Sequence, residues 1–334
     1  MEDSRQEMCE SLRRMGMLAD GEEPEFTALT GGVSSDIWRV DLAAGPICIK
    51  RALAQLKVAA EWWAPVERNA SEVAWIEAAR KVSPTCAPEI LGHDPEAGLF
   101  AMKFLDPSQY RLWKNELRDG NVILADAAAV GDVLGRIHAA TADDPECAQR
   151  FANDSVFYDI RLEPYLVATG RAHPDLADNF AVLLQVTAET QRVVIHGDVS
   201  PKNILIGPDG PVFIDAECAC FGDPAFDLAF CLNHLLLKCL WTRAATVALL
   251  DAFGVLAARY LAHVDWEEPE VLDARAARLL PGLLLARVDG KSPVEYLTEE
   301  ADKNIVRSAA RALLDNPAPR LGEIRSYWKE MLNE

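Results

Sequence analysis

The stretch that decides the fold is VVIHGDVSPKNILI, residues 193–206, followed by GPDGPVFIDAE at 207–217. An apolar run ends at Ile195, a polar loop follows, and a second apolar run begins at Ile204. Gly-Pro-Asp-Gly at 207–210 favours a turn, after which a third apolar run returns. The pattern predicts a strand, a loop and then a hairpin.

The predicted hairpin would gather oxygen-bearing side chains in one place. If its two strands pair around the turn, Asn203 lies nearly opposite Asp215, with Asp198 in the loop just before. Asn203, Asp215 and Glu217 offer hard oxygen ligands, which suit magnesium carried in with a nucleotide. Asp198 can accept a proton from a substrate hydroxyl or fix its orientation. Phosphoryl transfer needs little beyond metal ions and one carboxylate that positions the nucleophile.

The motif His-Gly-Asp-x-x-x-x-Asn at 196–203, followed by Asp215, resembles the signature of the aminoglycoside phosphotransferase and choline kinase-like superfamily. That superfamily is related to protein kinases. The resemblance implies an α+β, protein-kinase-like fold of two lobes. A small β-rich N-lobe at 1–105 would bind the nucleotide, and a larger, mostly helical C-lobe at 106–334 would hold the catalytic loop, metal site and substrate site. It also implies an enzyme, a kinase that uses ATP and Mg²⁺ to phosphorylate a small-molecule hydroxyl.

By this resemblance Asp198 is the catalytic base, and Asn203 and Asp215 hold magnesium. The alternative is that these three side chains merely cap loops. His196 is expected to brace the loop through hydrogen bonds rather than to react. Asp227, at the start of an apolar helix, either holds the catalytic loop through backbone N–H groups or caps that helix.

The amino-terminal half supplies the nucleotide-binding elements that the resemblance requires. Small residues between two strand-like runs let the backbone approach phosphates. The candidates are Gly31, Gly32, Ser34 and Ser35. Lys50 ends the next strand-like run and resembles the kinase lysine that contacts the α- and β-phosphates, with Arg51 as its competitor.

The partner of that lysine is expected to be a glutamate on the following helix. Glu72 fits best, and the rivals are Glu61, Glu67 and Glu77. The interlobe hinge is expected at Met102 to Leu105, where Met102 and Phe104 would contribute to adenine binding. Met102 is equally compatible with plain core packing. Because a hinge reads bases mainly through its backbone, GTP stays possible beside ATP.

The sequence Asp215-Ala216-Glu217 replaces the Asp-Phe-Gly of protein kinases, and its second carboxylate leaves one or two magnesium ions open. With residues 221–224 and 232–236, it resembles methylthioribose kinases, which bind their sugar with C-lobe arginines. Arg287 is the nearest match. Those kinases, however, have two adjacent arginines and a longer chain, whereas Ala286 precedes Arg287 here.

Substrate contacts are expected from the helical lobe. The preferred candidates are Arg287 and Asp289, which are expected to act together in the segment 287–291, and His234; further polar groups in apolar contexts are Tyr158, Arg161 and Tyr165. Each of these alone is also compatible with packing or surface exposure. Resemblance in the core transfers the reaction and not the substrate. An aminoglycoside, an amino alcohol, a sugar or methylthioribose therefore all stay open as acceptors.

Hydrophobic periodicity predicts the wider organisation. Strands are expected at 25–29, 37–42, 46–50 and 99–104, and helices at 1–20, 65–80, 122–141, 174–190, 225–240, 242–263, 268–287 and 299–315. The change from strand-rich to helix-rich character falls near residue 105.

The chain of 334 residues carries a net charge of −19 from 33 basic and 52 acidic side chains. Such a surface repels phosphate backbones and anionic lipid, so no nucleic-acid or membrane partner is expected. It would tolerate a cationic substrate. We expect no membrane span, no signal peptide and no zinc site, eight reduced cysteines and a cytoplasmic protein, as monomer or homodimer.

Two other classes compete with a small-molecule kinase. A non-catalytic nucleotide-binding protein with this fold typically loses the base or the metal ligands, whereas Lys50, Asp198, Asn203 and Asp215 are all present. A protein kinase would carry Asp-Phe-Gly, Ala-Pro-Glu and an arginine in place of Gly197. The sequence has no Asp-Phe-Gly, no arginine at 197 and no Ala-Pro-Glu after Asp215, since its one Ala-Pro-Glu lies at 87–89, and this argues against that class.

Overall fold

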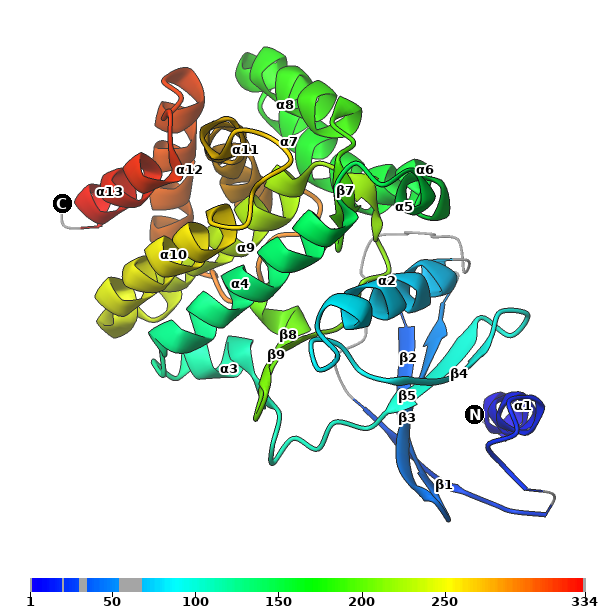
Figure 1. Ribbon diagram of the computed structural model, residues 1–334. Coiled ribbons are helices and arrows are strands. Elements are labelled where there is room, and N and C mark those ends of the chain that lie inside the picture. The colour runs from blue at the N-terminus through cyan, green and yellow to red at the C-terminus, as the bar shows by residue number, and fades with distance from the viewer. Residues whose placement is uncertain (1, 20, 30–34, 54–67, 333–334) are drawn as a thin grey trace.

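A small sheet and a larger helical region make up the protein (Figure 1). The computed structural model describes residues 2–19, 21–29, 35–53 and 68–332. The sheet is antiparallel and five-stranded, in the order β1-β2-β3-β5-β4. Its strands are β1 (Glu25–Ala28), β2 (Ser35–Leu42), β3 (Gly45–Ala52), β4 (Ile90–Asp94) and β5 (Leu99–Lys103).

Two helices pack against this sheet. One completes the small hydrophobic core of the sheet itself, and the other belongs to the main core of the helical region. α1 (Glu2–Arg14) places Met8 and Leu12, four residues apart, against Val40 and Ile49 of the sheet. Burial of each such side chain contributes about 1.5–3 kcal/mol. α2 (Arg68–Val82) buries Trp75 and its neighbours in the core that it shares with the helical region. The sheet is thereby anchored to the rest of the molecule through α2.

The helical region holds the remaining elements. Its helices are α3 (Trp113–Arg118), α4 (Leu124–Thr141), α5 (Pro145–Arg150), α6 (Asp154–Phe157), α7 (Ala168–Ala172), α8 (Ala177–Glu189), α9 (Pro224–Trp241), α10 (Thr246–Leu261), α11 (Pro269–Asp289), α12 (Glu300–Asp315) and α13 (Leu321–Met331). A π-helical segment spans Tyr158–Val167, between α6 and α7. Short strands are β6 (Arg111–Leu112), β7 (Val193–Ile195), β8 (Ile204–Gly207), β9 (Gly210–Phe213) and β10 (Cys220–Gly222).

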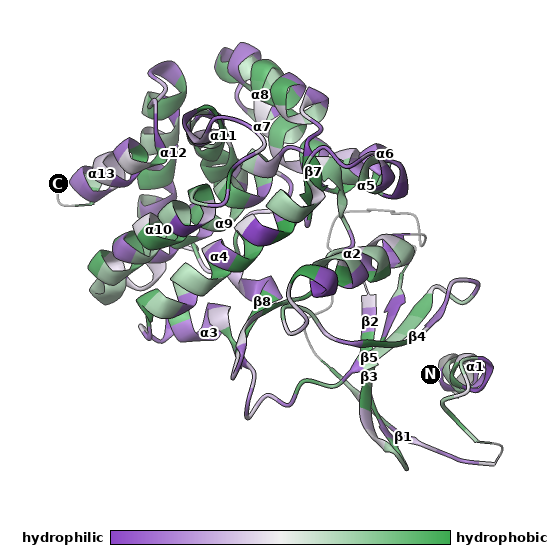
Figure 2. Ribbon diagram, viewed as in Figure 1, coloured by the Kyte–Doolittle hydropathy of each residue, from purple (hydrophilic) through white to green (hydrophobic). Residues whose placement is uncertain are grey.

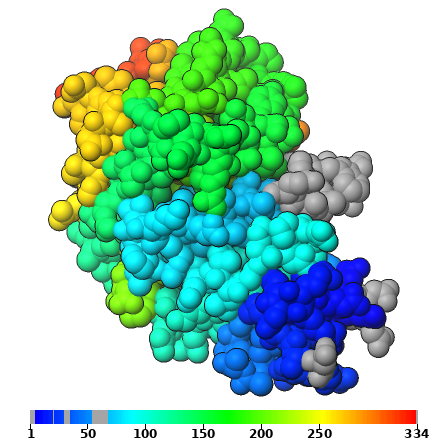
Figure 3. Space-filling view, turned by 45° about the vertical axis from the view of Figure 1, so that its right-hand side comes forward, coloured from blue at the N-terminus to red at the C-terminus, as the bar shows by residue number. Residues whose placement is uncertain are grey.

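Helix α9 forms the centre of this region. Every residue from Pro224 to Leu240 is buried, as expected for a helix whose residues are mostly apolar. α13 is amphipathic instead, and buries Leu321, Ile324 and Trp328 at three- and four-residue spacing. Figure 2 shows the corresponding mixture of hydrophilic and hydrophobic residues along α13. The space-filling view shows the sheet and its helices seated below the helical region (Figure 3).

The predicted fold class is confirmed, and the expected strands and long helices are present with shifts of a few residues at their ends, except that the helix expected over 1–20 already ends at Arg14. The helix expected over 242–263 begins later, because a 3₁₀ turn at Arg243–Ala245 precedes α10. The sequence patterns missed β4, the π-helical segment and α13. β4 was missed because Gly92 and a register shift interrupt its alternation.

The helical stretch Arg243–Leu261 is long and apolar enough to cross a membrane by length and composition, which corrects the expectation that no run qualifies. In this structure its apolar residues pack inside the protein. α10 packs against α4 and α9, and Leu249, Phe253 and Leu256 lie in the main core. The stretch occupies the position of a core helix in the helical region.

Candidate active site

The loop at 196–203, which the sequence predicts to be the catalytic loop, turns at a glycine with a positive φ. β7 ends at Ile195, and Gly197 then adopts a φ of +77°, in the left-handed region that side chains disfavour. A Cβ on Gly197 would lie 2.8 Å from the Cβ of Cys218, too close for any other residue to fit without movement. This contact gives a structural reason why the arginine of protein kinases is replaced here.

The loop returns through a 3₁₀ turn at Pro201–Asn203 into the predicted hairpin of β8 and β9. Ile204 pairs with Phe213, and Gly207 pairs with Gly210 across the turn. The backbone N–H of Ile214 donates to the carbonyl oxygen of Asn203 at 3.0 Å. The expected position of Asn203 beside the end of β9 is therefore confirmed, and Asp215 follows directly.

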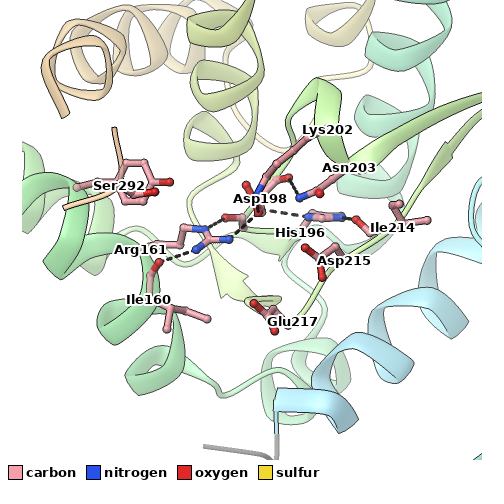
Figure 4. A network of polar contacts seen from close by, with 12 residues as sticks. Ile160, Arg161, His196, Asp198, Lys202, Asn203, Ile214, Asp215, Glu217 and Ser292 are labelled. Carbon is pink, nitrogen blue, oxygen red and sulfur yellow. Dashed lines mark hydrogen bonds and ion pairs between the residues drawn. The ribbon is translucent and has the colours of Figure 1, made fainter. Parts of the chain in front are cut away.

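Asp198 is buried, and two basic side chains reach its carboxylate (Figure 4). Arg161 Nη2 lies 2.8 Å and Lys202 Nζ 3.2 Å from Asp198 Oδ2. Arg161 is itself fixed, because its Nε donates to the Gly197 carbonyl at 2.7 Å and its Nη1 to the Ile160 carbonyl at 2.6 Å. The loop carboxylate thus has a defined orientation.

The charge state of Asp198 follows from these neighbours. Burial raises the pKa of its carboxyl, but Arg161 and then Lys202 outweigh burial and hold the pKa below its usual range. Asp198 is therefore ionised at neutral pH. An ionised carboxylate can accept a hydrogen bond, and then a proton, from a hydroxyl group brought next to it.

His196 and Asp227 hold the loop through hydrogen bonds to its backbone. The Asp198 N–H donates to His196 Nδ1 at 3.2 Å, which leaves Nε2 to donate to the Ile214 carbonyl at 3.1 Å. Burial lowers the pKa of His196, which agrees with this neutral form. Asp227 accepts the N–H groups of His196 and Gly197, whereas the cap of α9 is formed by Asp223. Of the two interpretations of Asp227, the loop-holding one matches its contacts.

Asn203 and Asp215 have the donor chemistry that magnesium requires. Asn203 Nδ2 donates to the Asp198 carbonyl at 3.1 Å, so its amide oxygen is left as an acceptor. Burial raises the pKa of Asp215, but Lys50 and Lys202 outweigh this and hold its carboxyl ionised. Two oxygen ligands suit magnesium, which also takes phosphate oxygens and waters. Within the described part of the chain, no group of three or more His, Cys, Asp or Glu residues could hold a metal ion.

Glu217 makes a different contact from the one expected. Its Oε2 accepts a hydrogen bond from Arg68 Nε, at the start of α2, at 2.9 Å. Arg68 is also buried and donates to the Leu53 carbonyl. Glu217 therefore joins the catalytic region to α2, and any role as a metal ligand stays a prediction.

Lys50 connects the sheet to this site. Its Nζ lies 2.6 Å from Glu72 Oε2 and also contacts Asp215 Oδ1. Burial lowers the pKa of Lys50, but Asp215 and Glu72 outweigh burial and raise it, so the lysine is charged. Arg51 points away, as the next residue of a strand must, and pairs with Glu7 and Asp36.

The other expected nucleotide contacts are placed as follows. Glu77 pairs with Arg150, away from Lys50, while Glu61 and Glu67 lie outside the described residues. Gly31, Gly32 and Ser34 also lie outside them. Ser35 is buried at the start of β2.

The expected hinge follows β5. Met102 lies in β5 opposite Cys48 and packs against the main core, which agrees with core packing. Phe104 follows the strand, with the Arg39 guanidinium 4.9 Å from its ring centre. The N–H of Lys103 is already used by the Glu89 carbonyl at 2.8 Å. This N–H is therefore not free to bind a base.

The three preferred substrate residues do not form one cluster. Arg287 donates to Tyr165 and Ser292, and His234 lies 3.3 Å from the hydroxyl of Tyr296. Asp289 instead binds Arg307 and His173. Arg287 and Asp289 are two residues apart on α11, so their side chains leave the helix on different sides. The expected grouping of these two residues is corrected accordingly.

Two residues of the site were missed by the sequence analysis. Lys202 stands inside the decisive stretch, four residues after Asp198, and its charge was the signal that could have identified it. Arg68 gave no local signal, because its partner Glu217 lies 149 residues away. Arg161 was noted only as a polar residue in an apolar setting.

Comparisons with known proteins agree with this geometry. The sequence model of the phosphotransferase enzyme family matches residues 25–268. Methylthioribose kinase 2 of Oryza sativa subsp. japonica is 24% identical over 58% of this chain and 52% of its own length. Methylthioribose kinase of Klebsiella pneumoniae (strain 342) is 27% identical over 57% of this chain and 54% of its own. The chain spans about half the length of these curated relatives.

Solved structures share the fold at low identity. An amicoumacin kinase in complex with AMP-PNP, Ca²⁺ and Ami has a TM-score of 0.59 at 10% identity, covering 97% of this chain and 98% of that one. The ethanolamine kinase of Plasmodium vivax has a TM-score of 0.55 at 13% identity, covering 96% and 85%. Because the family match covers well over half of the residues and coincides with the loop, hairpin and lysine described above, the chain belongs to the phosphotransferase enzyme family.

Proposed function

We propose that this protein is an ATP-dependent kinase that transfers the γ-phosphate of Mg-ATP to a hydroxyl group of a small molecule. The observation that carries the proposal is the contact of Lys50 with both Glu72 and Asp215. This contact joins Lys50, a buried cation of the sheet, to Asp215, which follows the β8–β9 hairpin. Asn203 directly precedes that hairpin, and Asp198 lies in the loop before it. A phosphate-binding cation, two metal ligands and a base are thereby available to one substrate.

Each side chain has a task in this reaction. Bound magnesium would neutralise phosphate charge, and Asn203 and Asp215 would hold it. Lys50 would contact the nucleotide phosphates. The ionised Asp198 accepts the proton of the acceptor hydroxyl as its oxygen bonds to phosphorus and the bond to the ADP oxygen breaks.

Lys202 and Arg161 extend this assignment. Both side chains form ion pairs with Asp198. Their two positive charges exceed the single negative charge of that carboxylate by one. A transferring phosphoryl group carries negative charge that two such cations would stabilise. We assign them to the reacting phosphate, with Arg161 also fixing the orientation of Asp198.

A methylthioribose kinase-like activity is the second candidate. It is favoured by the curated relatives, which are named as methylthioribose kinases, and by the buried Arg287. A non-catalytic nucleotide-binding protein is the third, and the retention of Lys50, Asp198, Asn203 and Asp215 disfavours it.

Acceptor-dependent release of ADP from Mg-ATP tests the proposal. The acceptor panel comprises aminoglycosides, choline, homoserine, methylthioribose, simple sugars and sugar acids, with the Asp198→Ala variant as the blank. We expect release with at least one acceptor and none above background in the variant. Release that is equal in both proteins would refute the assignment of Asp198, and tight Mg-ATP binding without any release would favour the non-catalytic alternative.

A further inference from the structure

A group of buried basic side chains lies in the helical region, and among the described residues none of them forms an ion pair with a carboxylate. We call His234, Lys238 and Arg287 the basic cluster. His234 and Lys238 are four residues apart on α9 and so share one face of it, while Arg287 comes from α11. The three residues are 4%, 1% and 7% exposed. Buried cations of this kind are normally paired.

The hydrogen bonds of the cluster are incomplete. Lys238 Nζ has no hydrogen-bond partner among the described residues, and lies 4.4 Å and 4.6 Å from the ring centres of Trp241 and Tyr296. His234 Nε2 and Arg287 Nε likewise have none within that part of the chain. Unpaired buried polar atoms are costly, so each calls for an explanation such as a missing ligand.

Nearby carboxylates are engaged elsewhere. Glu295 is bound by Lys114, and Asp289 by Arg307 and His173. Burial, and next the charge of Lys114, lower the pKa of Lys238 to about 7, although Glu295 acts in the opposite direction. Burial likewise lowers the pKa of His234, with Arg287 and Lys238 adding to the effect. Lys114, Lys238 and Arg287 thus all act on a single nearby carboxylate, that of Glu295, and an added anion would favour the charged form of Lys238.

The cluster is connected to the catalytic loop. Arg287 Nη1 donates to the hydroxyl of Tyr165 at 2.9 Å, and Tyr165 lies on the same π-helical segment as Arg161, which binds Asp198. Lys202, the other partner of Asp198, is among the charges that act on His234. In Figure 4, Ser292, which accepts from Arg287, is drawn on the Arg161 side of Asp198. An acceptor beside Asp198 would thus extend toward these cations.

We propose that the basic cluster binds an anionic group, a carboxylate or a phosphate, carried by the acceptor whose hydroxyl faces Asp198. This inference rests on the proposed kinase function. Arg287 and Lys238 would form charge-assisted hydrogen bonds with the anion and thereby complete their own bonding. Cationic acceptors such as aminoglycosides or choline would meet like charge at this point. The acidic net charge of the whole chain had suggested tolerance of a cation, and the local charge reverses that expectation.

Calorimetric titration of the protein saturated with Mg-AMP-PNP tests the proposal without requiring turnover. The probes are gluconate, glucose 6-phosphate, neutral sorbitol and cationic glucosamine, which share a six-carbon polyol. We expect at least one of the two anions to bind ten times more tightly than sorbitol and glucosamine, and the better anion distinguishes carboxylate from phosphate. In Lys238→Met and Arg287→Gln, this advantage falls below threefold.

Controls separate charge from folding damage. Lys329→Met, at an exposed lysine on α13, keeps the full anion advantage. Lys238→Met removes a charge and its contacts with the rings of Trp241 and Tyr296, but no hydrogen bond seen in the structure, so the variant stays folded even if Arg287→Gln unfolds. Anions that bind no more tightly than sorbitol, undetectable binding of every probe included, overturn the proposal. An advantage that survives Lys238→Met also overturns it.

The same preparation distinguishes this proposal from the kinase function. Anion-selective binding without Asp198-dependent ADP release from any acceptor would refute the kinase assignment and leave the anion site in place. Asp198-dependent release with neutral acceptors alone, and no anion preference in binding, would support the kinase and refute the site.

Discussion

The Asp227 carboxylate accepts a hydrogen bond from the backbone N–H of Gly197 at 2.8 Å, which ties the catalytic loop to helix α9. Its second oxygen accepts the N–H of His196 at 2.7 Å. Asp227 is fully buried, so the two N–H groups that it binds have no water to replace it as their acceptor. The position of Asp198, the next residue along, therefore depends on a carboxylate at the centre of the helical region.

Asp227→Asn should weaken both the fold and the reaction. The new NH₂ group would face an N–H donor, so one loop N–H loses its acceptor, at about 1–3 kcal/mol in the free energy of unfolding. Urea unfolding and kcat are measured together, and both should fall. Asp223→Asn on the same helix should lower stability through the cap and Arg275 while leaving kcat close to normal. An equal loss of kcat in both variants would contradict a specific role for Asp227.

Glu72→Gln should weaken nucleotide binding. The pair of Lys50 and Glu72 is buried on both sides, so a neutral partner leaves the lysine less firmly held. We expect the KM for Mg-ATP to rise about tenfold, which corresponds to about 1.4 kcal/mol. Glu77→Gln, at an exposed glutamate of the same helix, is the matched control and should change nothing. An unchanged KM in Glu72→Gln would mean that Lys50 does not depend on this partner.

Arg161→Gln should shift the pH dependence of the reaction. Burial raises the pKa of Asp198, and Arg161 is the largest of the charges that lower it. Without Arg161 the carboxyl binds its proton at higher pH, so the acidic limb of the kcat profile moves upward, by about one pH unit or more. The exposed Arg171→Gln on α7 should leave that limb in place. A downward shift, or none, would exclude control of Asp198 by Arg161.

The parts of this site that sequence could predict are those fixed by short-range rules. Alternation of apolar residues around a Gly-Pro-Asp-Gly turn determines the pairing of β8 with β9, and hence the place of Asn203 beside the end of β9. The two-residue period of a strand likewise places Lys50 and Arg51 on opposite faces. These patterns involve neighbours in the chain, so their consequences are readable without the fold.

The remaining contacts join segments whose approach only the packed fold determines. Arg161 contacts Asp198 from a π-helical segment, and no pattern in the sequence of that segment predicts a π-helix. Asp289 was grouped with Arg287 because they are close in the chain, yet its partner Arg307 comes from α12. Long polar side chains can satisfy several partners, so their choice depends on distances that local patterns do not contain.

Gly197→Ala separates backbone strain from steric contact at the catalytic loop. Gly197 has a φ of +77°, and Gly16 has nearly the same φ, +70°, with nothing within 4 Å of an added Cβ. Gly16→Ala should therefore cost only the backbone term, about 1 kcal/mol in the free energy of unfolding. In Gly197→Ala, the contact of 2.8 Å with the Cβ of Cys218 adds to that term.

We accordingly expect Gly197→Ala to lose clearly more stability than Gly16→Ala in urea unfolding, and to lose kcat as well. The loop can relieve the contact only by moving away from Cys218, which also displaces Asp198 and the N–H that Asp227 accepts. Among the substitutions at position 218, only glycine removes the Cβ that makes this contact. Cys218→Gly in the Gly197→Ala background should therefore restore part of the lost activity. Equal destabilisation of the two alanine variants, with full kcat in Gly197→Ala, would show that the loop tolerates a Cβ and that the close packing at Cys218 does not position Asp198.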